Sequence, residues 1–497
     1  MIAVILWYVF SVFLIWFMWD LLRSQDTPPG PFKFPLLGTL VQISLADPIP
    51  YKAFEKLAKK YGDVVSIKLG LKDAIVLNSY QSIRDVFTRD EALERPVYGP
   101  WWDRNFKKDL GIIFSSEELW VKIRKFVTKG FRDYGFGKKN SMEAVIHEEL
   151  QEFTDYIQNL ADSSPGNIVH FDTFYHLTFL NLVLSMLVGK RYKHDDKQLR
   201  YVMDNVNHFF KSGVVGAGIM TAYPFLRYVF PTMTGFKIQM EAIQAYHSYA
   251  REVLKEQRQL GDYKTDPQCF ADEFIHKIEE TKNDPNTIFT DEQFIILVVD
   301  FIQAGSETTS NVFNVAMLHL ALNQEMQDKL YKDIVQVIGT DRYPNLKDIE
   351  KLTYAKAVMY EAHRYSIVLP HLGLRQVTRD FYYNNYLFRK GTQIFPNIPA
   401  VSYDKEFWGD PENFRPERFI GAEGQLINLD RNLNFGAGKR NCIGEMLSKD
   451  SFLLYLTRLI QKFKFSIPDH LPAPRTDPML GFSLTAHPYD AKIELRL

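Results

Sequence analysis

Cysteine is scarce in this chain, because only Cys269 and Cys442 occur among 497 residues. The two positions lie far apart and belong to no cysteine-rich framework, so a disulfide scaffold of the secreted type is excluded. Their rarity is typical of a reducing compartment. A disulfide between them is an alternative that the spacing does not favour.

Net charge and repetition are also lacking. The 59 basic and 60 acidic residues give a formal net charge of −1, so there is no global attraction to nucleic acid and we expect no such partner. From about residue 36 onward there is no repeat, low-complexity tract or second linker. The sequence therefore favours one unusually large domain. Its 38 Phe and 26 Tyr make burial of a sizeable cofactor or apolar ligand feasible.

Charged residues are missing altogether from Met1 to Trp19. As a helix this run would span about 28 Å, enough for a bilayer core. A basic start, a short apolar run and a small-residue cleavage site would mark a cleaved signal peptide, and none is clear. We predict an uncleaved membrane anchor at 1–20, a proline-rich hinge at 21–35 and one folded domain at 36–497. Arg23 and Lys33 follow the run, so the domain is expected to face the cytoplasm.

Helical patterns dominate the domain, and the predicted fold class is mainly α with small β-sheets (α+β). Short strands are expected at 64–69, 74–78 and within 381–395, where Gly391 and the pair Asn384-Asn385 supply turn chemistry.

The longest helical pattern runs from Thr290 to about Asn323, and Thr290 and Gln293 are spaced as a capping box. Its first half, 294–299, is apolar all round, which predicts a helix through the centre of the protein. Polar residues then appear inside the pattern: Gln303, Ser306, Glu307, Thr308 and Thr309. Such groups are unfavourable to bury without partners, so the cluster indicates a site.

Near the carboxyl end, residues 435–445 read FGAGKRNCIGE and precede a second helical stretch from 446 to about 463. Gly436 and Gly438 allow turns that a Cβ would obstruct, and Gly444 lets the next helix approach a flat group closely. Cys442 is expected at the start of that helix, where N–H groups and the dipole favour a thiolate. In isolation, an inert buried cysteine would be the commoner interpretation.

The loop resembles the F-x-x-G-x-R-x-C-x-G signature of the cytochrome P450 family and matches it at every fixed position. The resemblance extends over nearly the whole chain and is closest to animal microsomal members, including arthropod ones. It implies the cytochrome P450 fold, haem b (iron protoporphyrin IX) with Cys442 as its axial ligand, and monooxygenase activity with dioxygen. A thiolate ligand pushes electron density onto the iron and promotes O–O cleavage.

The same resemblance implies further haem contacts. Arg440 matches the arginine that pairs with a propionate, and Trp120 and Arg124 reproduce the W-x-x-x-R pair on one helix face. Related enzymes often read P-x-x-x-P-H where this chain has residues 370–375, PHLGLR, so Arg375 is expected to replace the histidine. His371 then either lines the pocket or faces solvent. The complete implied set is Trp120, Arg124, Arg375, Arg440, Phe435, Gly436 and Gly444.

Two further motifs are implied to be structural. Glu361 and Arg364 supply the family's E-x-x-R, and Arg418 belongs to its second arginine motif, Pro416 to Phe419. By resemblance these three charged residues form a buried network behind the haem. We expect them to support haem binding without taking part in the chemistry.

The polar cluster in the long helix matches the family's [A/G]-G-x-[D/E]-T-T at residues 304–309. The resemblance implies that small Ala304 and Gly305 leave room for dioxygen and substrate. Glu307 and Thr308 resemble the acid and alcohol that deliver protons during oxygen activation. In isolation, a solvent-facing Glu-Thr-Thr on a helix would be the commoner interpretation.

A basic run indicates an electron donor. Seven basic residues and one acid, Asp133, occur between positions 122 and 139, and Lys439 and Lys449 lie near the cysteine loop. Such a face would steer an acidic flavoprotein, although a solvated helix is the plainer alternative. The implied partner is NADPH–cytochrome reductase, with cytochrome b5 as an additional candidate, at the endoplasmic reticulum membrane. The basic residues are Lys122, Arg124, Lys125, Lys129, Arg132, Lys138 and Lys139.

An aromatic, apolar connector at 223–231 either covers the substrate channel beside membrane lipid or packs in the core. The predicted pocket residues are Ile113, Phe114, Phe301, Ala304, Leu369 and His371. They indicate a lipophilic substrate, with steroid, terpenoid and fatty acid left open, and hydroxylation and epoxidation equally open. Two rival functions are a haem-thiolate isomerase or dehydratase and a non-catalytic haem-binding sensor or carrier.

Overall fold

The computed structural model describes residues 26–96, 99–115, 117–134, 139–211, 222–371 and 373–496, together with scattered residues between positions 7 and 18. Most of the predicted anchor, and residues 21–25 of the hinge, lie outside this described part. Within the described residues, no helix combines the length and the apolarity needed to cross a bilayer.

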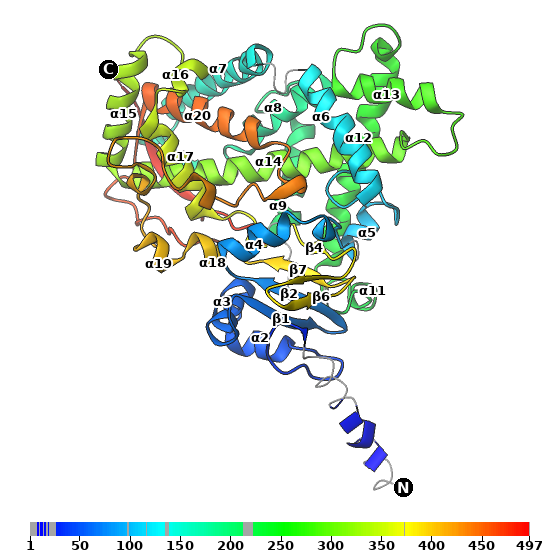
Figure 1. Cartoon of the computed structure of the whole chain (residues 1–497). Helices are drawn as coiled ribbons and strands as arrows, with labels where there is room; N and C mark the ends of the chain where they lie inside the picture. The colour runs from blue at the N-terminus through cyan, green and yellow to red at the C-terminus, as the bar shows by residue number, and fades with distance from the viewer. Residues whose placement is uncertain are drawn as a thin grey trace.

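Helices make up most of the described chain, which confirms the predicted fold class (Figure 1). The first half contains α2 (Leu40–Ala46), α3 (Pro50–Tyr61), α4 (Tyr80–Phe87), α5 (Pro100–Arg104), α6 (Glu117–Asp133), α7 (Lys139–Ser163), α8 (His176–Val188), α9 (Lys197–Lys211), α11 (Leu226–Val229) and α12 (Phe236–Leu260). The second half contains α13 (Phe270–Thr281), α14 (Asp291–Leu322), α15 (Gln324–Ile338), α16 (Leu346–Ile349), α17 (Thr353–Ser366), α18 (Ile398–Ser402), α19 (Lys405–Trp408) and α20 (Glu445–Lys462).

The long helix α14 crosses the middle of the molecule, as its apolar first half predicts (Figure 1). It packs against α8, α12 and α17, and nearly all of its residues are buried. The Thr290 hydroxyl caps it by accepting from Gln293 N at 3.1 Å. The predicted capping box is incomplete, because the side chain of Gln293 turns away and its Oε1 accepts from Gly111 N at 3.2 Å. The start of α14 is therefore tied to the segment before α6.

Strands are present at or near 64–69, 74–78 and 381–395, where the sequence predicts them, and the described chain adds four strands that were not predicted. The largest has the order β1 (Val64–Leu69), β2 (Lys72–Leu77), β7 (Gln393–Pro396) and β4 (Arg375–Gln376), with only β2 and β7 parallel. β5 (Phe381–Tyr383) and β6 (Tyr386–Phe388) form a hairpin whose turn places Asn384 and Asn385 at φ of 50° and 64°, values that asparagine tolerates. The third sheet has the order β3 (Ile168–Phe171), β9 (Tyr489–Leu495) and β8 (Phe463–Ser466).

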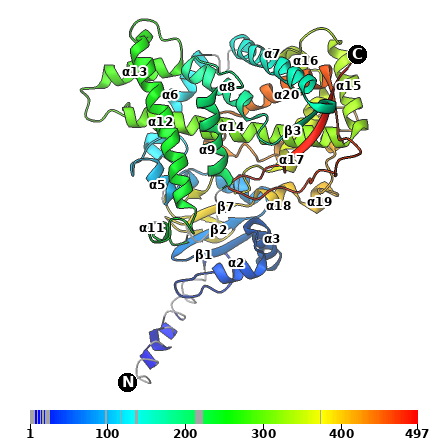
Figure 2. The ribbon, with the colours of Figure 1, turned by 180° about the vertical axis from the view of Figure 1, so that it is seen from behind.

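The two ends of the molecule differ in construction. The four-stranded sheet, α2 and α11 lie at the end nearest the amino terminus, and the helical body lies beyond them (Figures 1 and 2). The loop that carries Cys442 enters α20, which packs beside α14 and α17. The fold thus brings the carboxyl-terminal loop against the middle of the central helix.

Candidate functional site

The loop at 435–444 is shaped by its glycines. Gly436 and Gly438 have φ of 81° and 70°, in the left-handed region that favours glycine. A Cβ on Gly438 would also lie 2.3 Å from the carbonyl oxygen of Phe87. Cys442 N donates to the Phe435 carbonyl at 2.8 Å and closes the loop. The chain can therefore turn sharply just before α20.

The Cys442 sulfur lies at the start of α20. Burial raises the pKa of the Cys442 thiol, and hydrogen bonds from the backbone of Gly444 and Glu445 oppose that rise. Cys442 keeps accessible surface at this position. A Cβ on Gly444 would lie 3.8 Å from Sγ. The two backbone donors favour a thiolate, and metal coordination would deprotonate the thiol outright.

Four arginines gather beside this loop: Arg95, Arg124, Arg375 and Arg440. Within the described residues, Nε and Nη1 of both Arg375 and Arg440, and Nε of Arg95, have no hydrogen-bond partner. Burial lowers the pKa of Arg440 to about 8 and that of Arg95 to about 10, and Arg95 and Arg124 reinforce the shift at Arg440. Buried guanidinium groups with unpaired N–H donors call for an anion.

Haem b fits these donors, because its two propionates are carboxylates and a guanidinium matches a carboxylate with two parallel hydrogen bonds. Trp120 adds a flat aromatic ring at this place, with the guanidinium carbons of Arg440 and Arg124 at 4.3 and 5.5 Å from its centre. Arg124 also donates to the backbone and side-chain oxygens of Asn441, each at 2.9 Å. Arg95 was missed in the sequence, where no motif marks it.

On α14, surface remains accessible in the middle of an otherwise buried helix. Ala304 is exposed and Thr308 half-buried, one turn apart, and Thr308 Oγ1 donates to the Ala304 carbonyl at 2.7 Å. Because both lie in the middle of the central helix, their accessible surface indicates an internal hollow beside them. Gly305 differs from the prediction, because its missing Cβ would lie 2.6 Å from Val183 Cγ2. Gly305 therefore permits close packing of α8 on α14 and does not widen the space for dioxygen.

Glu307 is 1% exposed and has defined partners. Its Oε1 accepts from Asn311 Nδ2 and from Ser483 Oγ, both at 3.1 Å. Its Oε2 has no hydrogen-bond partner within the described residues. The helix-surface alternative for Glu307 is therefore wrong. The Ser483 contact was missed because nothing in the sequence connects positions so far apart.

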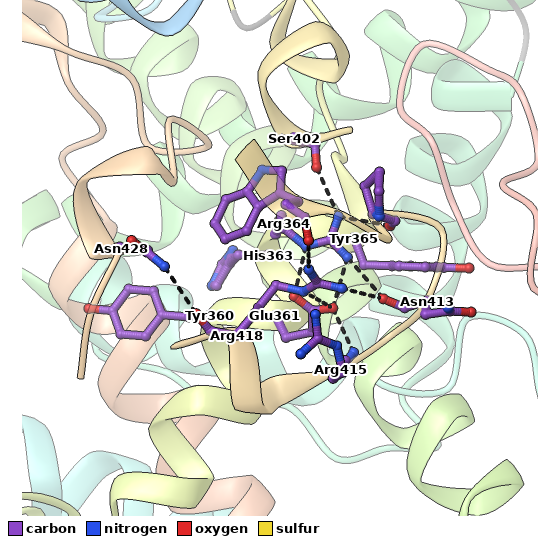
Figure 3. A network of polar contacts seen from close by, with 12 residues as sticks. Tyr360, Glu361, His363, Arg364, Tyr365, Ser402, Asn413, Arg415, Arg418 and Asn428 are labelled. Carbon is purple, nitrogen blue, oxygen red and sulfur yellow. Dashed lines mark hydrogen bonds and ion pairs between the residues drawn. The ribbon is translucent and has the colours of Figure 1, made fainter. Parts of the chain in front are cut away.

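The structure brings the three predicted network residues together (Figure 3). Arg364 Nε and Nη2 donate to the two oxygens of Glu361 at 2.7 and 2.8 Å, and Arg418 Nε donates at 3.2 Å. Arg415 N adds a fourth donor at 2.7 Å. The Nη1 and Nη2 atoms of Arg364 and Arg418 also donate to backbone carbonyls of residues 402–413. The network thus joins α17 to the segment before the cysteine loop.

Aromatic rings form a wall near the segment that follows α5. Trp101 stacks on Phe114 with ring centres 4.5 Å apart, and the rings of Phe209 and Phe482 meet Trp101 edge-on at 5.7 and 5.3 Å. Of the predicted pocket residues, Ile113, Phe114 and Leu369 are half-buried. Trp101, Phe209 and Phe482 were not predicted, because their meeting depends on three separate segments.

A buried ion pair holds that segment against α14. Arg104 Nη2 donates to Asp300 Oδ1 at 2.5 Å, and both side chains are almost completely buried. Asp300 Oδ2 also accepts from the backbone N–H groups of Ile112 and Ile113 at 2.6 and 3.2 Å. In the sequence, the sign of this contact is a single acid, Asp300, directly after the apolar run 294–299.

Two pocket predictions need correction. Phe301 is 6% exposed and packs against Phe131 and Phe270, with ring centres 4.7 and 6.2 Å apart, so it is a core residue. His371 is buried between Phe54 and Phe395, at 5.3 and 6.0 Å, so the solvent-facing alternative is wrong. Burial lowers the pKa of His371 to about 4. Both side chains are used in packing.

A cysteine at the start of α20 beside buried guanidinium groups with unpaired N–H donors is the arrangement that a haem-thiolate site requires. A sequence model of the family described as Cytochrome P450 matches residues 28–493. The chain belongs to the cytochrome P450 family, and it is a monooxygenase that uses haem b with an axial cysteine thiolate.

Known proteins are similar to this chain over almost its full length. The chain is 32% identical to Farnesoate epoxidase of Bombyx mori over 485 residues, which cover 95% of each chain. It is 29% identical to Cytochrome P450 2D20 of Mesocricetus auratus over 93% of this chain and 92% of that one. It is also 29% identical to Cytochrome P450 2E1 of Oryctolagus cuniculus, with the same two coverages.

Proposed function

We propose that this chain inserts one atom of dioxygen into an apolar substrate, with Cys442 as the ligand of the haem iron. The observation that carries the proposal is Cys442 at the start of α20 beside buried guanidinium groups that lack an anion. Arg95, Arg375 and Arg440 would hold the propionates, joined by Trp120 and Arg124. When bound, the haem supplies the iron that activates dioxygen.

Glu307 and Thr308 of α14 would transfer protons during oxygen activation. Thr308 has a hydroxyl at the hollow, one helical turn from Ala304. Glu307 lies next to it in the chain and keeps one carboxylate oxygen without a partner in the described structure. An acid and an alcohol so placed can pass a proton to the oxygen that leaves as water. A haem-thiolate isomerase or dehydratase would need no such pair, and neither would a sensor or carrier.

For the substrate we propose a terpenoid acid or ester, with epoxidation as the reaction. The relative named Farnesoate epoxidase supports this choice. The ring wall of Trp101, Phe114, Phe209 and Phe482 supports it too, because it offers an apolar surface to an extended hydrocarbon chain. A steroid or a fatty acid, and hydroxylation, are the alternatives.

Reconstitution with reductase and NADPH under isotope-labelled dioxygen tests the function. We expect one labelled oxygen atom in the product of a terpenoid ester, positioned across a former double bond. A panel of steroids and fatty acids in the same assay tests the alternative substrate classes. Product without label would favour an isomerase or dehydratase. Haem binding with no product from any compound would favour the carrier.

We further propose that the domain sits on the endoplasmic reticulum membrane and faces the cytoplasm. Two apolar surfaces support this: Leu36 and Leu45 of the amino-terminal region are 70% and 82% exposed, and Phe225 and Met233 are 60% and 86% exposed. Tyr223 joins the two by donating to the Leu36 carbonyl at 2.8 Å. Side chains so exposed are not core, which corrects that alternative for the connector. Helices α2 and α11, in these two regions, lie at the end of the molecule nearest the amino terminus (Figure 1).

The electron donor is proposed to dock on α6 and the cysteine loop. Arg124 ties α6 directly to Asn441 in that loop. Lys125 is exposed, and Lys129 is 69% exposed, with a long contact of 3.9 Å to Glu273. Two other predicted cations already form ion pairs within the chain, Lys439 with Asp90 and Lys449 with Glu445, each at 2.6 Å. Lys138 lies outside the described residues.

Reversing the charge of Lys125 and Lys129 to glutamate is expected to slow the first reduction by the reductase by about tenfold at low salt, because steering of an acidic partner is lost. Stopped-flow reduction measures the rate, and haem content should not change. The matched control is the double reversal of Lys332 and Lys347, exposed lysines of α15 and α16. Equal reduction rates in the two double variants would remove the docking proposal.

A further inference from the structure

The last loop before β9 presents neighbouring residues to two different parts of the site. Phe482 N donates to the Phe210 carbonyl at 2.7 Å, and Leu484 N donates to the Val368 carbonyl at 2.8 Å. These bonds hold the backbone on both sides of Ser483. The Phe482 ring joins the aromatic wall, while the Ser483 hydroxyl reaches α14.

Ser483 meets Glu307 in a fully enclosed place. Ser483 is 2% exposed, Glu307 1% and Asn311 4%. The Ser483 hydroxyl and the Asn311 amide both donate to Glu307 Oε1. His176 Nε2 lies 3.5 Å from the other polar atom of that amide, Asn311 Oδ1. Glu307 therefore has one anchored oxygen.

The anchoring gives the two carboxyl oxygens different tasks. Oε1 receives two hydrogen bonds, so a proton on it would displace a donor. Oε2 has no hydrogen-bond partner in the described chain, so it is the oxygen that can carry a proton. Asn311 lies four residues along the same helix as Glu307, so it cannot position Glu307 relative to another segment. Ser483 comes from a separate loop and sets the carboxyl group relative to the aromatic wall.

We propose that Ser483 is a positioning residue for Glu307, which holds Oε1 so that Oε2 presents the proton for oxygen cleavage. This inference rests on the proposed role of Glu307. The water formed from one oxygen atom takes up two protons and two electrons: each proton leaves Oε2, which is reprotonated from solvent, and the two electrons come from NADPH. Phe482 of the aromatic wall is the residue next to Ser483. The loop proposed to contact an apolar substrate therefore also positions the carboxyl group of Glu307.

The test compares Ser483→Ala and Ser483→Val with Ser483→Thr, which keeps the hydroxyl. We expect product formed per NADPH consumed to fall about tenfold in the first two, the effect of losing one hydrogen bond to a charged group. Released peroxide and the solvent deuterium isotope effect on product formation should rise. Thr and Val have nearly the same shape, so their difference isolates the hydroxyl. Ser483→Thr should recover at least about half of the coupling.

Haem content and the dissociation constant of the substrate should stay unchanged. Ser451→Ala is the matched control, since Ser451 is 1% exposed and its hydroxyl donates only to carbonyls of its own helix, α20. Normal coupling in Ser483→Val would overturn the proposal if Glu307→Gln uncouples. So would weaker substrate binding with intact coupling, which would make Ser483 a substrate contact. If Glu307→Gln is itself fully coupled, the acid assignment in the proposed function fails, and this inference fails with it.

Discussion

Replacing Cys442 with serine is expected to lower oxygen insertion by at least about a thousandfold, equivalent to about 4 kcal/mol of activation free energy. A serine hydroxyl stays protonated near neutral pH and donates little electron density, whereas a coordinated thiol is a thiolate that promotes O–O cleavage. The loop should keep its shape, because its glycines and the Cys442 N to Phe435 O bond do not involve sulfur.

The measurements are turnover with reductase and NADPH, and the carbon monoxide difference spectrum that reports thiolate ligation. Cys269→Ser is the matched control. Cys269 is buried at the start of α13, and burial raises the pKa of its thiol to about 12. The control should keep both the spectrum and turnover. A thiolate spectrum from Cys442→Ser would refute the ligand assignment.

Glu361→Ala is expected to yield protein without bound haem and to reduce the free energy of unfolding by about 3–5 kcal/mol. The change strands the guanidinium groups of Arg364 and Arg418, whose side chains are 1% and 3% exposed. It also removes the acceptor of Arg415 N, which positions the segment leading to the cysteine loop. Haem per protein and urea unfolding measure the two effects.

Glu417→Ala removes a carboxylate from an ion pair that is open to solvent, which makes it the control. Glu417 contacts Lys329 at 2.7 Å, and both side chains are more than 40% exposed. Exposed pairs contribute about 0–1 kcal/mol, so this variant should bind haem normally. A Glu361→Ala protein with full haem content and control-like stability would show that the network is dispensable.

Much of the architecture was predictable because its causes are local. Proline, glycine and asparagine mark turns, and the asparagine pair adopts the positive φ that its hairpin needs. The helical pattern of apolar residues and the capping residue Thr290 predicted the ends of α14 to within one residue of those observed. Gln293 departed from its expected role, because a distant backbone N–H at Gly111 competes for the same side chain.

The site was predictable where it follows a contiguous motif and unpredictable where it depends on segments meeting in space. Cys442, Arg440 and Glu307 stand in such motifs, and the chain order alone identified them. Phe301 shows the limit: an apolar residue beside the motif can face either the hollow or the core. The rotation of α14 against α6 and α13 turned it toward Phe131 and Phe270.

By itself the sequence determined the family, the cofactor and the residue that would bind its iron, because these depend on residue types at short fixed spacings. Only the tertiary structure decided that Arg95 joins the arginine cluster, that Asp300 holds the segment after α5 and that Ser483 anchors Glu307. Each of those contacts is a hydrogen bond or a charge buried between distant segments. Burial and distance are properties of the packed chain, and no local pattern of residues encodes them.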